Sequence, residues 1–204
     1  RDWSSDVCSS DLGFSEWNAK QISDGLSFQK QKGFDQFVSS QPQYSMLWRV
    51  IEKEVVPVCE SNGIGQIVWS PIAQGVLSGK YQAGKKPPKK SRATDKKGGA
   101  EMISKFMRDD LLRAVENLKP IAKKLDLTMA QLAVAWVLQN PNVSSAIIGA
   151  TKPDQIKENV KAAGVKIPSE IMLEIDSVIG RFAEKDPRSE EHTSELQSRQ
   201  YLVC

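Results

Sequence analysis

Residues 131–159 read QLAVAWVLQNPNVSSAIIGATKPDQIKEN, and this stretch decides the fold. Thr128 and Gln131 have the spacing of a capping box, which predicts the start of a helix. That helix is apolar nearly all round over Leu132–Leu138 and is therefore expected to be buried. A strand is expected over Ser144–Ile148. Because proline is favoured in the first turn of a helix, Pro153 predicts that a second helix follows this strand.

The same alternation continues toward the N-terminus. Asn18 with Gln21 three residues later predicts a helix start, and Gly33 predicts its stop. A short strand is expected over Gln36–Ser40, and Ile64–Trp69 has the apolar character of a buried parallel strand. Between these two strands, apolar residues repeat at helical spacing and predict a helix that ends before Gly63, namely Leu47, Val50, Ile51, Val55 and Val58.

The remaining segments add a loop and three helical stretches. Ser78–Met107 shows no clear period and holds a lysine cluster and two adjacent prolines, so it is predicted to be a long surface loop. A helix is expected from Asp109 and Asp110, interrupted at Pro120 because proline lacks an N–H and clashes with the preceding turn. A final amphipathic helix is expected over Ser169–Ile179.

Strands alternating with helices imply a parallel sheet with helical crossovers. The chain offers three strands and a short N-terminal stub at Gly13–Ser15. So few strands cannot close a barrel, and they would leave two open edges.

Composition excludes several classes of protein. Of 204 residues, 40% are hydrophobic and 26% are charged, which is ordinary for a globular chain. No apolar run reaches the roughly 20 residues that cross a bilayer, and no secretory h-region is present, so a cytoplasmic protein without a membrane partner is expected. Cys8, Cys59 and Cys204 are odd in number and widely spaced, which fits neither a disulfide framework nor a metal site.

Charge does not favour a nucleic-acid partner. The formal net charge is only +3, and the positive residues gather in one segment, 85–97. This segment lacks interleaved aromatic residues, and Asp95 interrupts it, so a solvated loop is expected.

The two ends differ from the rest of the chain. Residues 1–12 (RDWSSDVCSSDL) and 188–204 (RSEEHTSELQSRQYLVC) are Ser-rich, lack periodicity, and resemble translated sequencing adapter. Both are expected to be foreign or disordered tails around one unit at 13–187. A pair of natural disordered tails would have the same composition. The single histidine, His192, lies in the second tail, so the unit itself is expected to hold no histidine chemistry.

Two expected strand ends carry residues suited to a phosphorylated ligand. After the strand that ends at Trp69, the chain offers glycines for close backbone approach and Lys80 for positive charge, although a core tryptophan beside a surface lysine would look the same. After the strand that ends at Ile148, free N–H groups at the next helix and the Lys152 ammonium could bind an anion, although an ordinary capped helix would also fit.

A third segment, Ser39–Tyr44, is polar, and with Ser15 it could hydrogen-bond a carboxamide. A polar loop of no special function would look alike. Its meaning therefore depends on the two segments above.

Together and in this order, the segments resemble the aldo-keto reductases, in particular the branch that includes potassium-channel β-subunits. The resemblance covers Gly13–Gly180. Its most specific strings are WSPIAQGVLSGKY (Trp69–Tyr81), QLAVAWVLQNP (Gln131–Pro141) and AIIGATKPDQIKEN (Ala146–Asn159). It implies a partial (β/α)8 TIM barrel, the C-terminal half, with about strands five to eight and their helices.

The resemblance also implies NADPH as cofactor and assigns the residues that bind it. Trp69 matches the aromatic residue that stacks on the nicotinamide, and Ser15 and Gln41 match residues that hold its carboxamide. Glu16 departs from the Asn that many relatives have at this position. The pyrophosphate loop corresponds to Ser70, Pro71, Ile72, Gly75 and Lys80. The helix start near the adenosine 2′-phosphate corresponds to Gly149, Thr151, Lys152 and Gln155, and the adenine contacts correspond to Glu158 and Asn159.

The parent protein is then expected to reduce an aldehyde or ketone by hydride transfer. The family's Asp, Tyr, Lys and His tetrad belongs to the first four strands, which lie upstream of Gly13, and neither Tyr44 nor Tyr81 matches a catalytic position. The chain alone is therefore expected to be inactive, with no catalytic residue of its own. The alternative is an NADPH-sensing regulatory subunit like the potassium-channel β-subunits.

Overall fold

The computed structural model describes residues 12–187. The expectations for residues 1–11 and 188–204, with Cys8, His192 and Cys204, lie outside the described residues. Within them, no helix is both long enough and apolar enough to span a membrane.

Four parallel strands form one sheet in the order β1-β2-β3-β4, as the alternation predicted. They are β1 (Gly13–Phe14), β2 (Ser39–Ser40), β3 (Gly65–Trp69) and β4 (Val143–Ile147). The prediction of a strand over Gln36–Ser40 is correct only for its last two residues. The Gln29 side chain bonds the Asp35 carbonyl and the Phe37 N–H instead, and these contacts tie residues 35–37 to the preceding helix.

Three helices lie where the sequence predicted them, two from capping signals and one from its amphipathic pattern. Helix α1 (Ala19–Lys32) begins at the Asn18 capping box and ends at Gly33, whose φ of 68° is left-handed. Helix α6 (Met129–Val137) has the predicted Thr128 and Gln131 capping box, and its residues 131–137 are all buried. Helix α8 (Ser169–Ile179) has the predicted bounds.

The helix predicted over residues 47–58 is divided into a short 3-10 helix, η1 (Val50–Glu52), and α2 (Val55–Ser61). The first residues cannot enter it because Trp48 pairs with Ser45 and with Glu184, and the Arg49 N–H donates to the Glu184 carbonyl. The predicted interruption near Pro120 is confirmed. One helix ends at Asn117 and the next begins at Lys119, giving α4 (Asp109–Asn117) and α5 (Lys119–Lys124).

The prediction of an unstructured loop over Ser78–Met107 is wrong in part. The segment contains the 3-10 helices η2 (Ala73–Ser78), which overlaps its start, and η3 (Arg92–Thr94), and also α3 (Gly99–Ser104). Ile103 and Phe106 are buried in the core and anchor α3 there, which is a tertiary contact that periodicity does not reveal.

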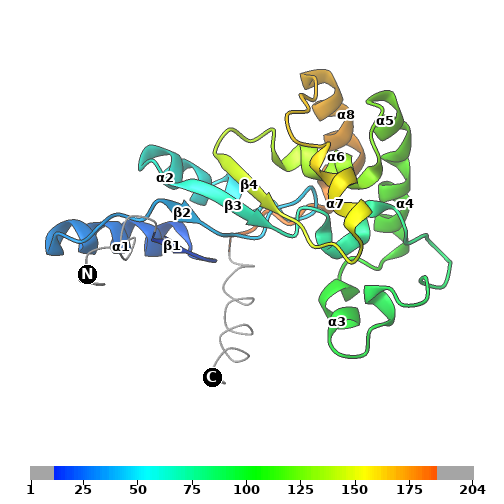
Figure 1. Cartoon of the computed structure of the whole chain (residues 1–204), viewed down its shortest axis with the longest axis horizontal. Helices are drawn as coiled ribbons and strands as arrows, with labels where there is room; N and C mark the ends of the chain where they lie inside the picture. The colour runs from blue at the N-terminus through cyan, green and yellow to red at the C-terminus, as the bar shows by residue number, and fades with distance from the viewer. Residues whose placement is uncertain (1–11, 188–204) are drawn as a thin grey trace.

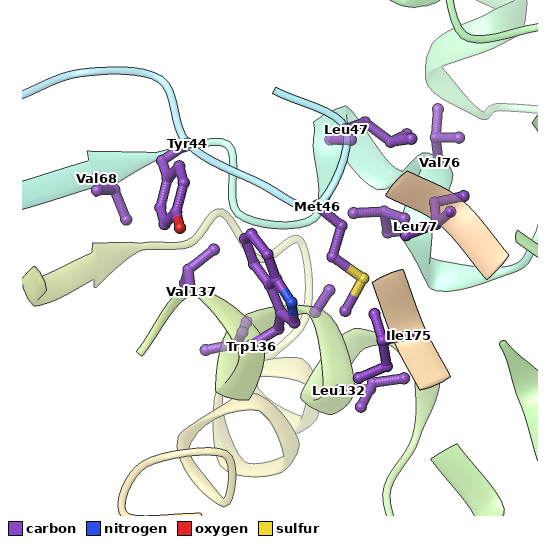
Figure 2. Close-up of a cluster of buried hydrophobic side chains, with 14 of the residues drawn as sticks. Tyr44, Met46, Leu47, Val68, Val76, Leu77, Leu132, Trp136, Val137 and Ile175 are labelled. Carbon is purple, nitrogen blue, oxygen red and sulfur yellow. The ribbon is translucent and has the colours of Figure 1, made fainter. Parts of the chain in front are cut away.

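Figure 1 shows the strands side by side at the centre, with α1 at one end of the molecule and α4, α5, α6 and α8 gathered at the other. Helix α7 (Pro153–Val160) follows β4 on the same side as α6. A buried core joins the sheet to the helices. In Figure 2, side chains from the segment after β2, from β3, η2, α6 and α8 meet in one buried cluster around Met46 and Trp136.

A buried cation ties the last helix to this core. The Arg49 guanidinium lies 4.7 Å from the centre of the Trp136 ring, and it also pairs with the Asp176 carboxylate on α8. Because a buried charge needs such partners, Arg49 holds α8 against the segment that follows β2.

Candidate functional site

A pocket of about 460 Å³ opens where β3 and β4 end, and we call it the strand-end pocket. Parallel strands present their carboxyl ends at one edge of a sheet, which is where ligands bind in α/β folds. Two segments that lie far apart in the sequence therefore meet there. The lining residues are Ser70, Pro71, Ile72, Gln74, Gly75, Lys80, Lys90, Ser91, Arg92, Ile147, Ile148, Gly149, Ala150, Thr151 and Gln155.

The loop after β3 has an unusual backbone. The φ angles of Ser70, Ala73 and Gln74 are positive, at 56°, 45° and 58°. Residues other than glycine rarely adopt such angles. The loop folds into consecutive tight turns, in which the N–H groups of Ala73 and Gly75 donate to the carbonyls of Ser70 and Ile72. Strain of this kind persists where the surrounding structure imposes it, most often at functional sites.

Gly75 lies beneath the Lys80 side chain. Its φ is 95°, and a β-carbon built on it would lie only 2.8 Å from the Lys80 Nζ. The missing side chain therefore leaves the space in which the ammonium rests against the pocket wall. The hydroxyl of Ser78 donates to the Gly75 carbonyl over 2.7 Å and fixes this turn.

The opposite wall is the start of α7. The side-chain oxygen of Gln155 accepts hydrogen bonds from the backbone N–H of Thr151 at 2.8 Å and from that of Lys152 at 3.3 Å. These two N–H groups lie just before Pro153, the first residue of α7, and a neutral side chain satisfies them. Thr151 and Gln155 line the strand-end pocket; Lys152, between them, is exposed beside it.

The segment predicted as a solvated lysine loop returns to the site. Lys90 and Arg92 line the strand-end pocket with Lys80, and no carboxylate of residues 12–187 is among its lining. Three cations with no carboxylate among the lining residues favour an anionic ligand. The buried Ser91 hydroxyl has no hydrogen-bond partner within the described residues. Sequence reasoning missed these residues, since charge clustering alone did not show where the loop folds.

The residues predicted to contact a nicotinamide and its carboxamide lie at the ends of β1, β2 and β3. The Ser15 hydroxyl, after β1, donates to the Gln41 carbonyl, after β2, over 2.7 Å. Trp69 ends β3, its carbonyl accepts from the Tyr44 N–H, and its own N–H donates to the Pro42 carbonyl. Ser15, Gln41 and Trp69 therefore lie at the ends of neighbouring strands, and Trp69 directly precedes the first residue of the strand-end pocket.

Glu16 joins this group, although the sequence indicated only that it departs from the usual asparagine. Its Oε1 accepts from the Trp69 indole Nε1–H and from the Gln43 backbone N–H, both over 2.7 Å. Burial raises the pKa of the Glu16 carboxyl, and the two hydrogen bonds offset only part of that effect. Its φ of 56° is again left-handed.

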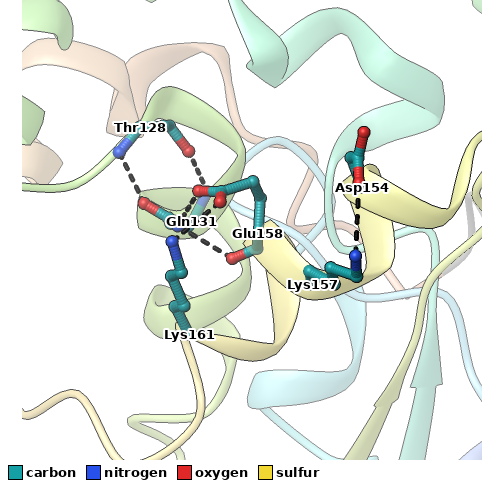
Figure 3. A network of polar contacts seen from close by, with 6 residues as sticks. All are labelled: Thr128, Gln131, Asp154, Lys157, Glu158 and Lys161. Atoms are coloured by element: carbon teal, nitrogen blue, oxygen red, sulfur yellow. Dashed lines mark hydrogen bonds and ion pairs between the residues drawn. The ribbon is translucent and has the colours of Figure 1, made fainter.

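The two remaining predicted residues lie farther along α7, outside the pocket lining. Figure 3 shows the Glu158 carboxylate between Gln131 and Lys161. Its Oε1 lies 2.7 Å from the Lys161 Nζ, and the Gln131 side chain donates to the Glu158 carbonyl over 2.8 Å. Asn159 is buried beside them. An adenine at this place would meet a polar surface already held in position.

Neither tyrosine of the described segment is among the residues that line the strand-end pocket. Tyr44 is buried and donates to the Glu52 carboxylate over 2.8 Å, and burial with that negative charge raises the pKa of its hydroxyl. Tyr81 is also buried, and its oxygen accepts from the Ala93 N–H. Tyr44 and Tyr81 therefore belong to the buried core rather than to the strand-end pocket.

Two other hollows of similar volume lie on helix surfaces, one beside Lys119 and Lys161 and one beside Arg113 and Arg181. Volume alone does not distinguish them from the strand-end pocket. Strand ends, a left-handed backbone and a positive lining occur together only in the strand-end pocket among these three, and this combination selects it.

Comparison with known proteins shows the family of the chain. Residues 10–180 match the model of the aldo/keto reductase family. The chain is 40% identical over 181 residues to an Arabidopsis thaliana protein described as "Probable voltage-gated potassium channel subunit beta", covering 88% of this chain and 54% of that protein. A rice protein (Oryza sativa subsp. japonica) with the same description is 40% identical over 170 residues, or 82% and 51%. The chain thus spans about half the length of these relatives.

Proposed function

Because the chain belongs to the aldo/keto reductase family, we propose that it is the C-terminal, NADPH-holding half of a reductase of aldehydes or ketones. The observation that carries the proposal is the strand-end pocket, where the loop after β3 and the start of α7 converge with three cations and no acidic residue among the lining. Family members typically use NAD(P)H, and a dinucleotide has the shape and charge for this edge of the sheet.

The residues present fit the phosphates of such a cofactor. Gly75 leaves room for Lys80, and Lys90 and Arg92 line the same pocket. The pocket volume of about 460 Å³ suits part of a dinucleotide, with the remainder extending along the sheet edge.

The nicotinamide and adenosine ends of the cofactor extend in opposite directions from the strand-end pocket. Toward β1, Trp69 offers a ring face for the nicotinamide, and Ser15 and Gln41 hold its carboxamide. Toward α7, Thr151, Lys152 and Gln155 surround the adenosine 2′-phosphate, and for this reason we propose NADPH rather than NADH. Glu158 and Asn159 border the adenine.

When bound, NADPH supplies the hydride, and these residues orient it and exclude water. Tyr44 and Tyr81 lie outside the lining of the strand-end pocket, so we assign the proton donor to neither of them. We propose that the parent protein's Asp, Tyr, Lys and His tetrad supplies the proton from another part of the barrel, and that the chain alone does not turn over a carbonyl substrate.

The experiment is a calorimetric titration of the purified chain with NADPH and with NADH. Lys152→Glu should weaken NADPH binding about tenfold or more and leave NADH nearly unchanged, because only NADPH carries the 2′-phosphate. Lys157→Glu is the control, with the same charge change on the same helix at a residue paired with Asp154. Equal losses for both cofactors would remove Lys152 from the 2′-phosphate site.

A second candidate is a regulatory, NADPH-sensing role like that of the potassium channel β-subunits, and the similarity to the Arabidopsis and rice proteins favours it. The two functions separate in the parent protein. Carbonyl reduction that is lost when the tetrad tyrosine is replaced indicates the enzyme, whereas binding of a channel that survives that replacement indicates the regulator.

A further inference from the structure

Glu16 joins the ends of three neighbouring strands through one oxygen atom. It follows β1, it accepts the Gln43 N–H from the segment after β2, and it accepts the Trp69 indole N–H at the end of β3. We call Glu16, Gln43 and Trp69 the Glu16 cluster. The two contacts span 27 and 53 residues of sequence, so they are tertiary rather than local.

From this geometry, we infer that Glu16 is a positioning residue that fixes the plane of the Trp69 indole against the nicotinamide ring. The inference rests on the nicotinamide seat proposed above and deepens it. Glu16 acts through Trp69 and need not contact the cofactor itself.

Without the hydrogen bond to Glu16, the indole ring could rotate about the side-chain torsions of Trp69. Backbone hydrogen bonds at the Trp69 N–H and carbonyl fix its main chain, but they leave the ring free to turn about the side-chain torsions. A hydrogen bond from Nε1 to a fixed acceptor removes that freedom. Stacking depends on ring orientation, so a fixed indole binds a planar ligand with less loss of entropy.

The acceptor is itself held in place. Glu16 has a φ of 56°, a backbone conformation that residues other than glycine adopt only when the surrounding structure requires it. The Gln43 N–H provides a second anchor on the same oxygen. The carboxylate is partly desolvated, and hydrogen bonds to a charged acceptor of this kind are stronger than those between neutral groups.

The first test observes the indole directly in the 204-residue chain without cofactor. The Trp69 Nε1–H resonance is assigned by its loss in Trp69→Phe. Glu16→Ala should shift this resonance and speed its hydrogen exchange with solvent, and Glu16→Gln, which keeps an acceptor oxygen, should retain slow exchange. Unchanged exchange in Glu16→Ala would overturn the positioning role.

The second test compares NADPH with adenosine 2′,5′-bisphosphate, which has the phosphates of the adenosine end but no nicotinamide. Glu16→Ala should weaken NADPH binding about tenfold, the scale of one lost stacking contact, and leave the bisphosphate unchanged. In the Trp69→Phe background, the same replacement should have little further effect, because the indole N–H through which Glu16 acts is gone.

The other outcomes are decisive as well. Equal weakening of both ligands would show that Glu16 supports the fold as a whole. A loss in Glu16→Gln as large as that in Glu16→Ala would indicate a need for charge rather than for an acceptor. Either result overturns the inference while the proposed function stands. If the unaltered chain binds neither ligand, the proposed function fails and this inference fails with it.

Discussion

Replacement of Gly75 by alanine tests whether Lys80 and the strand-end pocket act as one phosphate site. The added β-carbon would lie 2.8 Å from the Lys80 Nζ, closer than real contacts allow, and 3.2 Å from its Cε, which is tight. The side-chain end is flexible, so it moves away. The ammonium is thereby displaced from the pocket wall, while the fold around it is retained.

The two effects of this replacement have different sizes. The left-handed backbone costs an alanine about 1–2 kcal/mol of stability. For binding, a cation about 4 Å from a phosphate contributes about 4 kcal/mol at an effective dielectric constant of about 20. Moving it to about 6 Å removes about 1.4 kcal/mol of this, or about tenfold in the dissociation constant.

Gly84→Ala is the matched control. Gly84 also has a left-handed φ, of 69°, but a β-carbon at this residue would have no other atom within 4 Å. Both variants should lose stability in urea unfolding, and only Gly75→Ala should lose affinity for NADPH in a calorimetric titration. Equal NADPH affinities in the two variants would refute the assignment of Lys80 to the phosphates.

Three further outcomes follow from the described contacts. The pKa of Glu16 is raised in the folded chain, so between its ordinary value of 4.5 and that higher value the native state binds the proton more tightly and stability falls as pH rises. The stability of Glu16→Gln relative to the unaltered chain should therefore increase across that window in urea unfolding, and a constant difference would contradict the buried carboxylate. Trp136→Ala should cost about 3–5 kcal/mol in the same assay, because it empties a core position and removes the ring beside Arg49; a loss below about 1 kcal/mol would not fit the packing. Thr128→Ala should cost about 1 kcal/mol through loss of the helix cap, seen as an earlier urea midpoint with an unchanged slope.

Sequence alone located the elements whose signals are local. The ends of α1 and α6 depend on side chains three residues apart, Asn18 with Gln21 and Thr128 with Gln131, and both capping boxes formed as expected. The residues of a helix cap lie within one turn of the helix, so a cap can be predicted without knowledge of the rest of the molecule.

Contacts between distant segments escaped the same reasoning. Helix α3 exists because Ile103 reaches the core, and β2 is short because Gln29 bonds the residues before it. In the site, the strand ends were predicted as a set, but Lys90 and Arg92 were assigned to solvent and Glu16 was noted only as a departure. Each of these depends on which segments become neighbours after folding, and periodicity does not contain that information.

The ion pair between Arg49 and Asp176 has a consequence for biosynthesis. Its partners are 127 residues apart, and the chain leaves the ribosome from its N-terminus, so Arg49 emerges long before α8 can reach it. During that interval the guanidinium has no carboxylate from the last helix, and the pocket that would bury it is incomplete. The Arg49 site is therefore completed by a contact made only after Asp176, 127 residues later, has also emerged.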